Sequence, residues 1–135
     1  MEADMTEELT IKTRESSELI NITTEVQSAV SRSGIKNGIC VVYVPHTTVG
    51  LLINEPEPGF HSDLMHFLDK LIPEKGSYRH PDGNAHAHIK ASLLGSSKHF
   101  LVKDGRLVLG TWQAIFLCEF DGPRTRQVMI KVMEG

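Results

Sequence analysis

The run Trp112-Gln113-Ala114-Ile115-Phe116-Leu117-Cys118-Glu119-Phe120 has the length and composition of a long β-strand. Alternate side chains of a strand point to opposite faces, and both faces of this run are largely apolar. A strand with two apolar faces is typically buried on both of them. The run therefore predicts a buried strand that carries a polar group at each end, Gln113 and Glu119.

These two polar groups are separated by about 20 Å if the strand is extended. We therefore expect that Gln113 and Glu119 cannot both serve one compact site within one subunit. A buried glutamate needs a partner, or its pKa shifts. The alternative is that each end of the strand reaches solvent, where neither group needs a partner.

Other segments around this run are also strand-like. Residues 38–44 are apolar on both faces and predict another strand that is buried on two sides. Asp104-Gly105 is a dipeptide favoured by tight hairpins, and apolar residues flank it. The remaining predicted strands cover residues 8–13, 18–23, 50–54, 100–102, 107–109 and 128–133.

Two segments have clear helical signals. Thr24 followed by Gln27 is a capping-box pattern, which predicts a helix of about ten residues that ends at Gly34. Apolar residues between Phe60 and Leu71 recur at helical spacing and predict an amphipathic helix.

A shorter helix is predicted over residues 85–94, with Asn84 as its cap. Ile89 and Leu93 give this helix an apolar face. The preceding segment, residues 74–83, contains glycine, proline and charged residues, and we expect an exposed loop that could act as a lid.

Together these elements predict one domain over residues 1–135. The fold class is α+β, a single compact domain with a largely antiparallel, β-sandwich-like core and two to three helices. The chain has 135 residues, of which 40% are hydrophobic, enough for one ordinary core. We find no internal repeat and no linker that would divide the chain.

Composition argues against several partners. The net charge is -3, from 14 basic and 17 acidic residues, so we expect no nucleic-acid partner and no membrane partner. No apolar run approaches the roughly 18 residues of a membrane span, and residues 1–13 do not resemble a secretory signal. Cys40 and Cys118 lie in apolar runs and are interpreted as buried thiols of a reducing compartment.

The histidines are the strongest indication of a functional site. The chain has seven, and His86 and His88 fall close together in residues 84–92. Neutral imidazole is the commonest metal ligand, and histidine titrates near physiological pH. Residues two apart on a helix point about 200° from each other, so both could bind one metal only on an extended segment. The alternative is a surface helix whose histidines are merely solvated.

Three further groups could carry chemistry. His46-Thr47-Thr48 follows a predicted buried strand, which gives a loop rigid support, although an ordinary turn is equally compatible. Asn54-Glu55 could supply a general base or a ligand for a hard metal, or could simply meet water at a strand end. Arg124 and Arg126 follow a glycine-proline turn and could bind phosphate or carboxylate, or pair with surface acids.

Common catalytic motifs are absent. The sequence has no phosphate-binding P-loop, no dinucleotide fingerprint and no His-Glu-x-x-His. It also has no Cys-x-x-Cys pair and no Gly-x-Ser-x-Gly nucleophile elbow.

In chain order, the groups above resemble the YjbQ family, whose members are often labelled secondary thiamine-phosphate synthases. The likeness runs from about Ile11 to Val132. The matching segments are Pro45 to Thr48, Asn54-Glu55, Asn84 to Gly95, Gly110 to Gln113 and Cys118 to Arg124.

The resemblance implies a cytoplasmic homotrimer with a compact α+β fold and a histidine-rich, metal-binding pocket, together with weak thiamine-phosphate-synthase activity. In a trimer, Gln113 and Glu119 could serve the pockets of different subunits, or one of them could be structural. Carried over onto this chain, the pocket comprises His46, Thr48, Asn54, Glu55, His86, His88, Ser92, Gln113, Glu119 and Arg124.

We therefore expect an enzyme that joins or cleaves a small phosphorylated or anionic molecule. His88, His46 and Glu55 are the expected catalytic groups, and His46, His86 and His88 the expected ligands of a divalent metal, zinc or magnesium. Two alternatives remain, a metal-dependent hydrolase and a non-catalytic binding module for a small anionic metabolite. The expected substrate-binding residues are Thr48, Asn54, Ser92, Gln113, Glu119 and Arg124.

Overall fold

The computed structural model describes residues 5–135, which form eight strands and three helices. The strands are β1 (Met5–Lys12), β2 (Glu18–Asn21), β3 (Gly38–Tyr43), β4 (Val49–Asn54), β5 (Ser97–Lys103), β6 (Arg106–Leu107), β7 (Ala114–Glu119) and β8 (Thr125–Glu134). The helices are α1 (Thr23–Ser33), α2 (Pro58–Leu71) and α3 (Ala85–Leu94).

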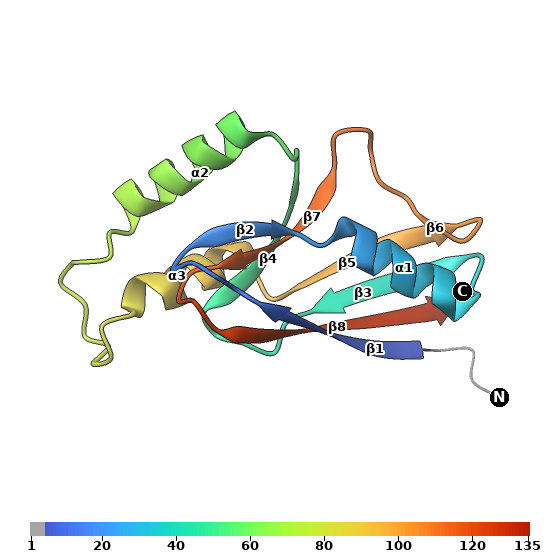
Figure 1. The fold of residues 1–135 in the computed structure, drawn as a ribbon, viewed down its shortest axis with the longest axis horizontal. Coiled ribbons are helices and arrows are strands. Elements are labelled where there is room, and N and C mark those ends of the chain that lie inside the picture. Colours follow the sequence, from blue (N-terminus) through green and yellow to red (C-terminus); the bar gives the residue numbers. More distant parts are fainter. Residues whose placement is uncertain (1–4) are drawn as a thin grey trace.

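The strands form two antiparallel sheets that pack face to face (Figure 1). The larger sheet has the order β1-β8-β3-β5-β6, and the smaller has the order β2-β7-β4. The main core lies between the two sheets and α1. The predicted compact α+β domain with an antiparallel sandwich is therefore confirmed. The core residues include Val26 and Val30 of α1, Val42 of β3, Leu51 of β4, Leu117 of β7 and Ile130 of β8.

The strand β7 is buried along its whole length, as its two apolar faces predict. Ile115 and Leu117 point into the main core. Phe116 and Cys118 point the other way, into a second cluster that α2 and α3 cover. The strand begins at Ala114, so the predicted residues before it belong to the preceding turn.

The prediction that residues 38–44 are buried on both faces is wrong. Cys40 and Val42 of β3 face the core, whereas Ile39 and Tyr43 point out of the larger sheet and are 41% and 45% exposed. No helix covers that outer face in the described part of the chain, because α1 packs into the main core and α2 and α3 cover the smaller sheet. An apolar outer face misled the sequence argument.

The helix α1 ends at Gly34, as predicted, with the glycine in the left-handed conformation. The predicted capping box is wrong, because the helix begins one residue earlier and its first residue is preceded by Ile22. Gln27 does not fold back to cap the helix. Its side chain instead donates to the carbonyl of Gly105 and accepts from the backbone N–H of Leu107, which ties α1 to the β5–β6 hairpin.

The helices α2 and α3 are both found where the sequence places them, but their apolar faces are less buried than expected. In α2 only Leu68 is fully buried, while Phe67 and Leu71 are each 59% exposed. In α3 the predicted apolar face is also exposed, with Ile89 at 40% and Leu93 at 61%. No helix of residues 5–135 is long and apolar enough to cross a membrane.

One ion pair joins α2 to α3. The Lys90 side chain is buried, and its Nζ donates to Asp69 Oδ1 over 2.5 Å. The same Nζ lies 5.9 Å from the ring centroid of Phe120. The buried cation is thus balanced by one carboxylate and one aromatic face, and this contact fixes the end of α2 beside α3.

Candidate functional site

The end of β7 carries a buried ion pair. Glu119 is fully buried, and Arg126 of β8 is only 4% exposed. Two parallel hydrogen bonds join them, from Arg126 Nε to Oε1 at 2.8 Å and from Nη2 to Oε2 at 2.5 Å. This bidentate geometry is the strongest form of an arginine–carboxylate contact. Of the two alternatives for Glu119, burial with a partner is therefore the one observed.

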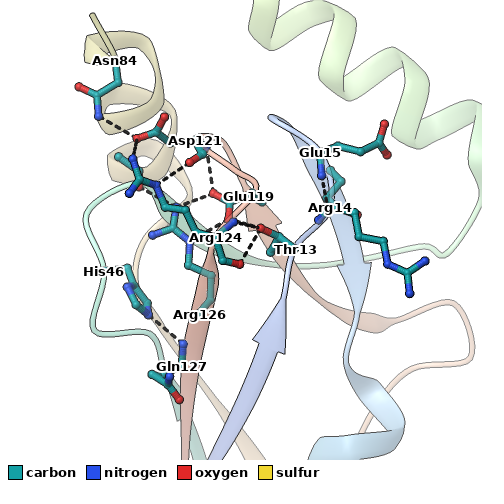
Figure 2. Close-up of polar contacts among 12 residues, drawn as sticks. Thr13, Arg14, Glu15, His46, Asn84, Glu119, Asp121, Arg124, Arg126 and Gln127 are labelled. Carbon is teal, nitrogen blue, oxygen red and sulfur yellow. Dashed lines mark hydrogen bonds and ion pairs between the residues drawn. The ribbon is translucent and has the colours of Figure 1, made fainter. Parts of the chain in front are cut away.

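Further hydrogen bonds complete the coordination of Glu119, as Figure 2 shows. Thr13 Oγ1 donates to Oε1 at 2.8 Å, and the backbone N–H of Asp121 donates to Oε2 at 2.9 Å. Arg126 Nη2 also donates to Thr48 Oγ1 at 2.8 Å. The network links β7, β8, the residue that follows β1 and the loop before β4, so it forms a rigid floor beneath the surface.

The pKa of Glu119 reflects this environment. Burial alone would raise it, because a carboxylate loses its hydration in the interior. Hydrogen bonds from Arg126, the Asp121 N–H and Thr13 outweigh that effect and hold the pKa below its ordinary value. Glu119 is therefore ionised at neutral pH and serves as a structural anion.

Gly122 lets the following turn approach this floor. A Cβ at this position would lie 2.8 Å from Glu119 Cγ and 2.9 Å from Thr13 Oγ1, and it would overlap the carbonyl oxygen of Glu15. Such contacts are too short for any real Cβ, so only glycine fits. The close approach places Arg124 at the surface directly above the buried pair.

Above the floor, two adjoining cavities open to solvent. One has a volume of about 340 Å³, and the other about 450 Å³. His46, Thr47 and His88 line both, so the two cavities share a wall. The predicted site residues that line one or both cavities are His46, Thr48, His88, Ser92 and Arg124.

Arg124 offers hydrogen-bond donors to this space. Its side chain is 55% exposed. Its Nε donates to the backbone carbonyl of Asp121 at 2.7 Å, and its Nη2 donates to Asp121 Oδ2 at 3.1 Å. A guanidinium has five N–H donors, so three are left for a ligand. Asn84 Nδ2 donates to the same Asp121 oxygen at 2.8 Å, which secures the start of α3 to the turn instead of capping the helix as predicted.

His46 has its tautomer set by the backbone. Its Nε2 accepts the N–H of Gln127 at 2.9 Å (Figure 2). In the neutral ring the proton must then sit on Nδ1, which becomes a donor. Burial and the nearby Arg126 lower the pKa of His46, and Glu119 opposes that shift only partly. His46 is therefore a neutral donor at pH 7.

His88 is the other imidazole of the cavities. It lies in the middle of α3, and its carbonyl accepts from Ser92 Oγ at 2.8 Å. Within residues 5–135 its ring nitrogens form no hydrogen bond, so they remain available to a ligand. A partly buried imidazole with no internal partner is suited to acid–base work or to anion binding.

Three predicted residues lie elsewhere. Asn54 is at the opposite end of β4, where it pairs in register with Ala114, the residue that follows Gln113. Gln113 is exposed and accepts the N–H of Gly110 through its side chain. Glu55 also lies at this end, and its carbonyl contacts His61 Nε2. The sequence argument that Gln113 and Glu119 cannot share one site within a subunit is consistent with these positions.

His86 is separated from His88 in the way that a helix requires. Both lie in α3, and His86 lines a different cavity of about 530 Å³, together with Lys90 and Asp69. Its Nδ1 is buried, without a hydrogen-bond partner among the described residues.

The predicted metal ligands are therefore not assembled within one subunit. No group of three histidine, cysteine or acidic side chains in residues 5–135 is arranged to hold a metal ion. His46 is already committed through Nε2, and His86 faces another cavity. The donor set of a single chain does not fit a zinc centre, which needs three or four converging ligands.

Two contributors to the cavities were not among the predicted site residues. Asp121 lines the cavity, and its carboxylate orients Arg124. Arg126 was recognised as one of two arginines, but its burial was not foreseen. The alternation of β8 could have shown it, since Arg126 has the same parity as Val128 and Ile130.

Known proteins share both this sequence and this fold. A family model described as UPF0047 protein YjbQ-like matches residues 7–135. The UPF0047 protein YugU of Bacillus subtilis is 47% identical over 131 residues, which cover 96% of this chain and 99% of the relative. A UPF0047 protein of Methanocaldococcus jannaschii is 49% identical over 124 residues, covering 91% of this chain and 90% of the relative.

Solved structures agree with these matches. A crystal structure of a YbjQ-like protein of unknown function from Sulfolobus solfataricus superposes with a TM-score of 0.95 and 38% identity, covering 98% of both chains. A YjbQ/UPF0047 protein from Clostridium acetobutylicum superposes with a TM-score of 0.91 and 48% identity, covering 93% of this chain and 98% of that one. The chain therefore belongs to the YjbQ-like UPF0047 family.

Proposed function

We propose that this protein is an enzyme that binds a small phosphorylated molecule in the cavities lined by His46, His88 and Arg124 and acts on it there. The observation that carries the proposal is that these three side chains, far apart in sequence, face one space above a rigid ion-pair floor. Rigid support of a few polar groups around a concave space is typical of binding sites.

Hydrogen-bond donors that point into the cavity, rather than its net charge, favour the binding of an anion. Arg124 is balanced by Asp121, and Arg126 by Glu119, so the cavity is close to neutral. The donors that remain are three N–H groups of Arg124, Nδ1–H of His46 and the ring of His88. Phosphate oxygens accept several such bonds at once, and charge-assisted bonds are the stronger ones.

The reaction that family resemblance suggests is the formation of thiamine phosphate. A pyrimidine diphosphate loses pyrophosphate, which leaves with the electron pair of the broken C–O bond, and a thiazole phosphate captures the pyrimidine. The departing pyrophosphate needs stabilisation of its growing negative charge. The ring nitrogen of the thiazole forms the new C–N bond without losing a proton. Arg124 would stabilise the departing pyrophosphate, and His88 would donate a proton to it.

We also propose that the protein is a homotrimer in which one subunit completes the cavity of the next. Asn54, Glu55 and Gln113 gather at the opposite end of the smaller sheet, away from His88. Trp112, beside them, is 70% exposed, and large exposed apolar groups commonly mark contact surfaces. Glu55 of one subunit would then act in the cavity of its neighbour. The buried free thiols Cys40 and Cys118 suit a reducing compartment, and we place the protein in the cytoplasm.

The proposed activity is tested by binding and turnover with matched variants. Calorimetry with inorganic phosphate and pyrophosphate, and product formation from pyrimidine diphosphate and thiazole phosphate, would compare the unaltered protein with His88→Ala. His99→Ala is the control, because His99 is an exposed histidine on β5. We expect His88→Ala to abolish turnover and His99→Ala to leave it unchanged. Binding of phosphate without turnover would contradict the proposed enzyme and favour a non-catalytic binding module. If neither phosphate nor pyrophosphate binds, the proposed binding site is rejected.

Sharing between subunits has its own test. Glu55→Ala and His88→Ala chains, each inactive alone, would be unfolded together, refolded and assayed. A site built from two subunits regains activity in the mixed assemblies, because some of their cavities contain both residues. A site built within one chain gains nothing from mixing, and that result would reject the shared cavity.

A further inference from the structure

The loop between α2 and α3 is internally braced. Tyr78 Oη donates to the carbonyl of Pro73 at 2.5 Å, and the backbone N–H of Tyr78 donates to Gly76 at 3.0 Å. The Tyr78 ring lies so close to Gly76 that a Cβ there would be 3.1 Å from it. Gly83 then adopts φ +76°, a conformation that favours glycine, and turns the chain into α3. The loop is therefore shaped by its own contacts.

The ends of this loop are also held together. The ion pair between Lys90 and Asp69 joins the helices on either side, so the loop spans a fixed gap. This arrangement presents His80 to α3. Its ring meets the ring of His88 at 4.7 Å between centroids, with an interplanar angle of 65°. Asp82 Oδ2 lies 3.7 Å from His80 Nε2.

We propose that His80 is a positioning residue for His88, a role that rests on the proposed function of the histidine cavities. Edge-to-face contact between two rings restricts the rotation of each, and such pairs contribute beyond their buried area. The His88 ring has no hydrogen bond within residues 5–135 that would fix it. The contact with His80 supplies that constraint, so that His88 meets the phosphate group of a bound ligand in one orientation.

The arrangement also gives the loop a function. The contacts of Tyr78 fix the shape of the loop, and the Lys90–Asp69 ion pair fixes its two ends. Together they hold His80 against His88. Asp82 is 75% exposed and adds at most a weak, screened attraction, so the ring contact is the part that matters.

The test compares two substitutions of His80 with a control. His80→Ala removes the ring, and His80→Phe keeps an edge-to-face partner without nitrogen atoms. His66→Ala is the control, because His66 is an exposed histidine on α2. Two quantities are measured on the intact chain, the ring proton signals of His88 by nuclear magnetic resonance and the affinity for inorganic phosphate by calorimetry.

We expect His80→Ala to remove the ring-current shift of the His88 protons and to weaken phosphate binding about three- to tenfold, the range that an aromatic pair of this kind contributes. His80→Phe should restore both quantities, and His66→Ala should change neither. An unchanged His88 signal in His80→Ala would overturn the proposal, as would an unchanged affinity. If the unaltered protein does not bind phosphate, the proposed function fails, while the His88 signal still decides whether His80 positions it.

Discussion

Two arginines that lie two residues apart differ completely in their surroundings. Arg126 is buried, and its guanidinium is occupied by Glu119 and Thr48. Arg124, two residues earlier, is more than half exposed and keeps most of its donors. The difference arises because Arg126 lies within β8 on the face that points into the core, whereas Arg124 precedes the strand and belongs to the turn.

The comparison shows how a small domain divides the work of its charged groups. The buried arginine contributes no chemistry to a ligand, but its network fixes the positions of three segments. The exposed arginine contributes little to stability, since surface ion pairs are weak, but it can meet a ligand. Substitutions at the two positions should therefore separate stability from binding.

The largest effect is expected for Arg126→Ala. Removing one partner of a buried pair leaves Glu119 as an uncompensated charge, which typically costs about 3–5 kcal/mol of the free energy of unfolding. Urea denaturation would measure this loss. The double variant Arg126→Met with Glu119→Gln should recover part of it, because no charge remains buried. If Arg126→Ala does not fold, Arg126→Lys, which keeps the charge but loses the bidentate contact, gives a smaller loss of the same origin.

A loss below about 1 kcal/mol, the typical value for exposed pairs, would contradict the structural role of Arg126. It would show that the pair is hydrated in solution. The two arginines would then be equivalent, and the contrast drawn between them would fail.

A somewhat smaller effect is expected on acidification. The pKa of Glu119 in the folded protein lies below its ordinary value of 4.5. As pH falls, Glu119 is therefore protonated first in the unfolded chain. The stabilisation that ionised Glu119 gives the folded protein is fully present above the pKa of the unfolded state. It is lost as pH falls through the pKa of the folded state. Urea midpoints of the unaltered protein and of Glu119→Gln should converge below pH 4.5. Glu57, whose pKa is also lowered, is present in both proteins and cancels from the comparison.

Sequence patterns predicted the fold well where one rule dominated. The two apolar faces of β7 required cover on both sides, and two layers provide it. Glycine signals at Gly34 and Asp104-Gly105 correctly marked a helix end and a turn, because positive φ values restrict the choice of residue. Burial was harder to predict. The apolar side chains of β3 and α2 point outward, and an apolar pattern alone does not say whether another surface covers it.

Four of the residues that the sequence argument selected line one cavity. His46, Thr48, His88 and Arg124 are brought together, because the loop before β4, α3 and the turn before β8 meet at one end of the smaller sheet. Sequence spacing alone could not show whether Asn54 and Gln113 belong to this cavity. Distance along one chain does not give the position of a neighbouring subunit, which could supply either residue. His80 was missed, because nothing in an irregular loop indicates which side chain turns back onto a helix.

The expectation that Arg124 contributes to binding and not to stability is tested by Arg124→Ala. Loss of its charge-assisted bonds should weaken phosphate binding by about ten- to a hundredfold, while the free energy of unfolding changes by less than about 1 kcal/mol. Calorimetry and urea denaturation would measure the two quantities. Arg106→Ala, at an exposed arginine on β6, is the matched control and should leave binding unchanged. A large loss of stability in Arg124→Ala would mean that this arginine, too, belongs to the floor.

The smallest effect is expected for His46. This residue contacts both the buried floor and the cavity, because its Nε2 accepts a hydrogen bond from the backbone of β8 while its Nδ1 is left for a ligand. His46→Ala should cost about 1 kcal/mol, the typical net value of one hydrogen bond. The pKa of His46 is lowered from 6.5 in the folded protein, so the unfolded chain binds the proton first and this contribution is lost as pH falls below 6.5. Urea midpoints of both proteins at pH 8 and at pH 5 should therefore differ less at the lower pH. A difference that grows on acidification would instead mean that the proton stabilises the folded ring, and His46 would then meet its ligand as a cation.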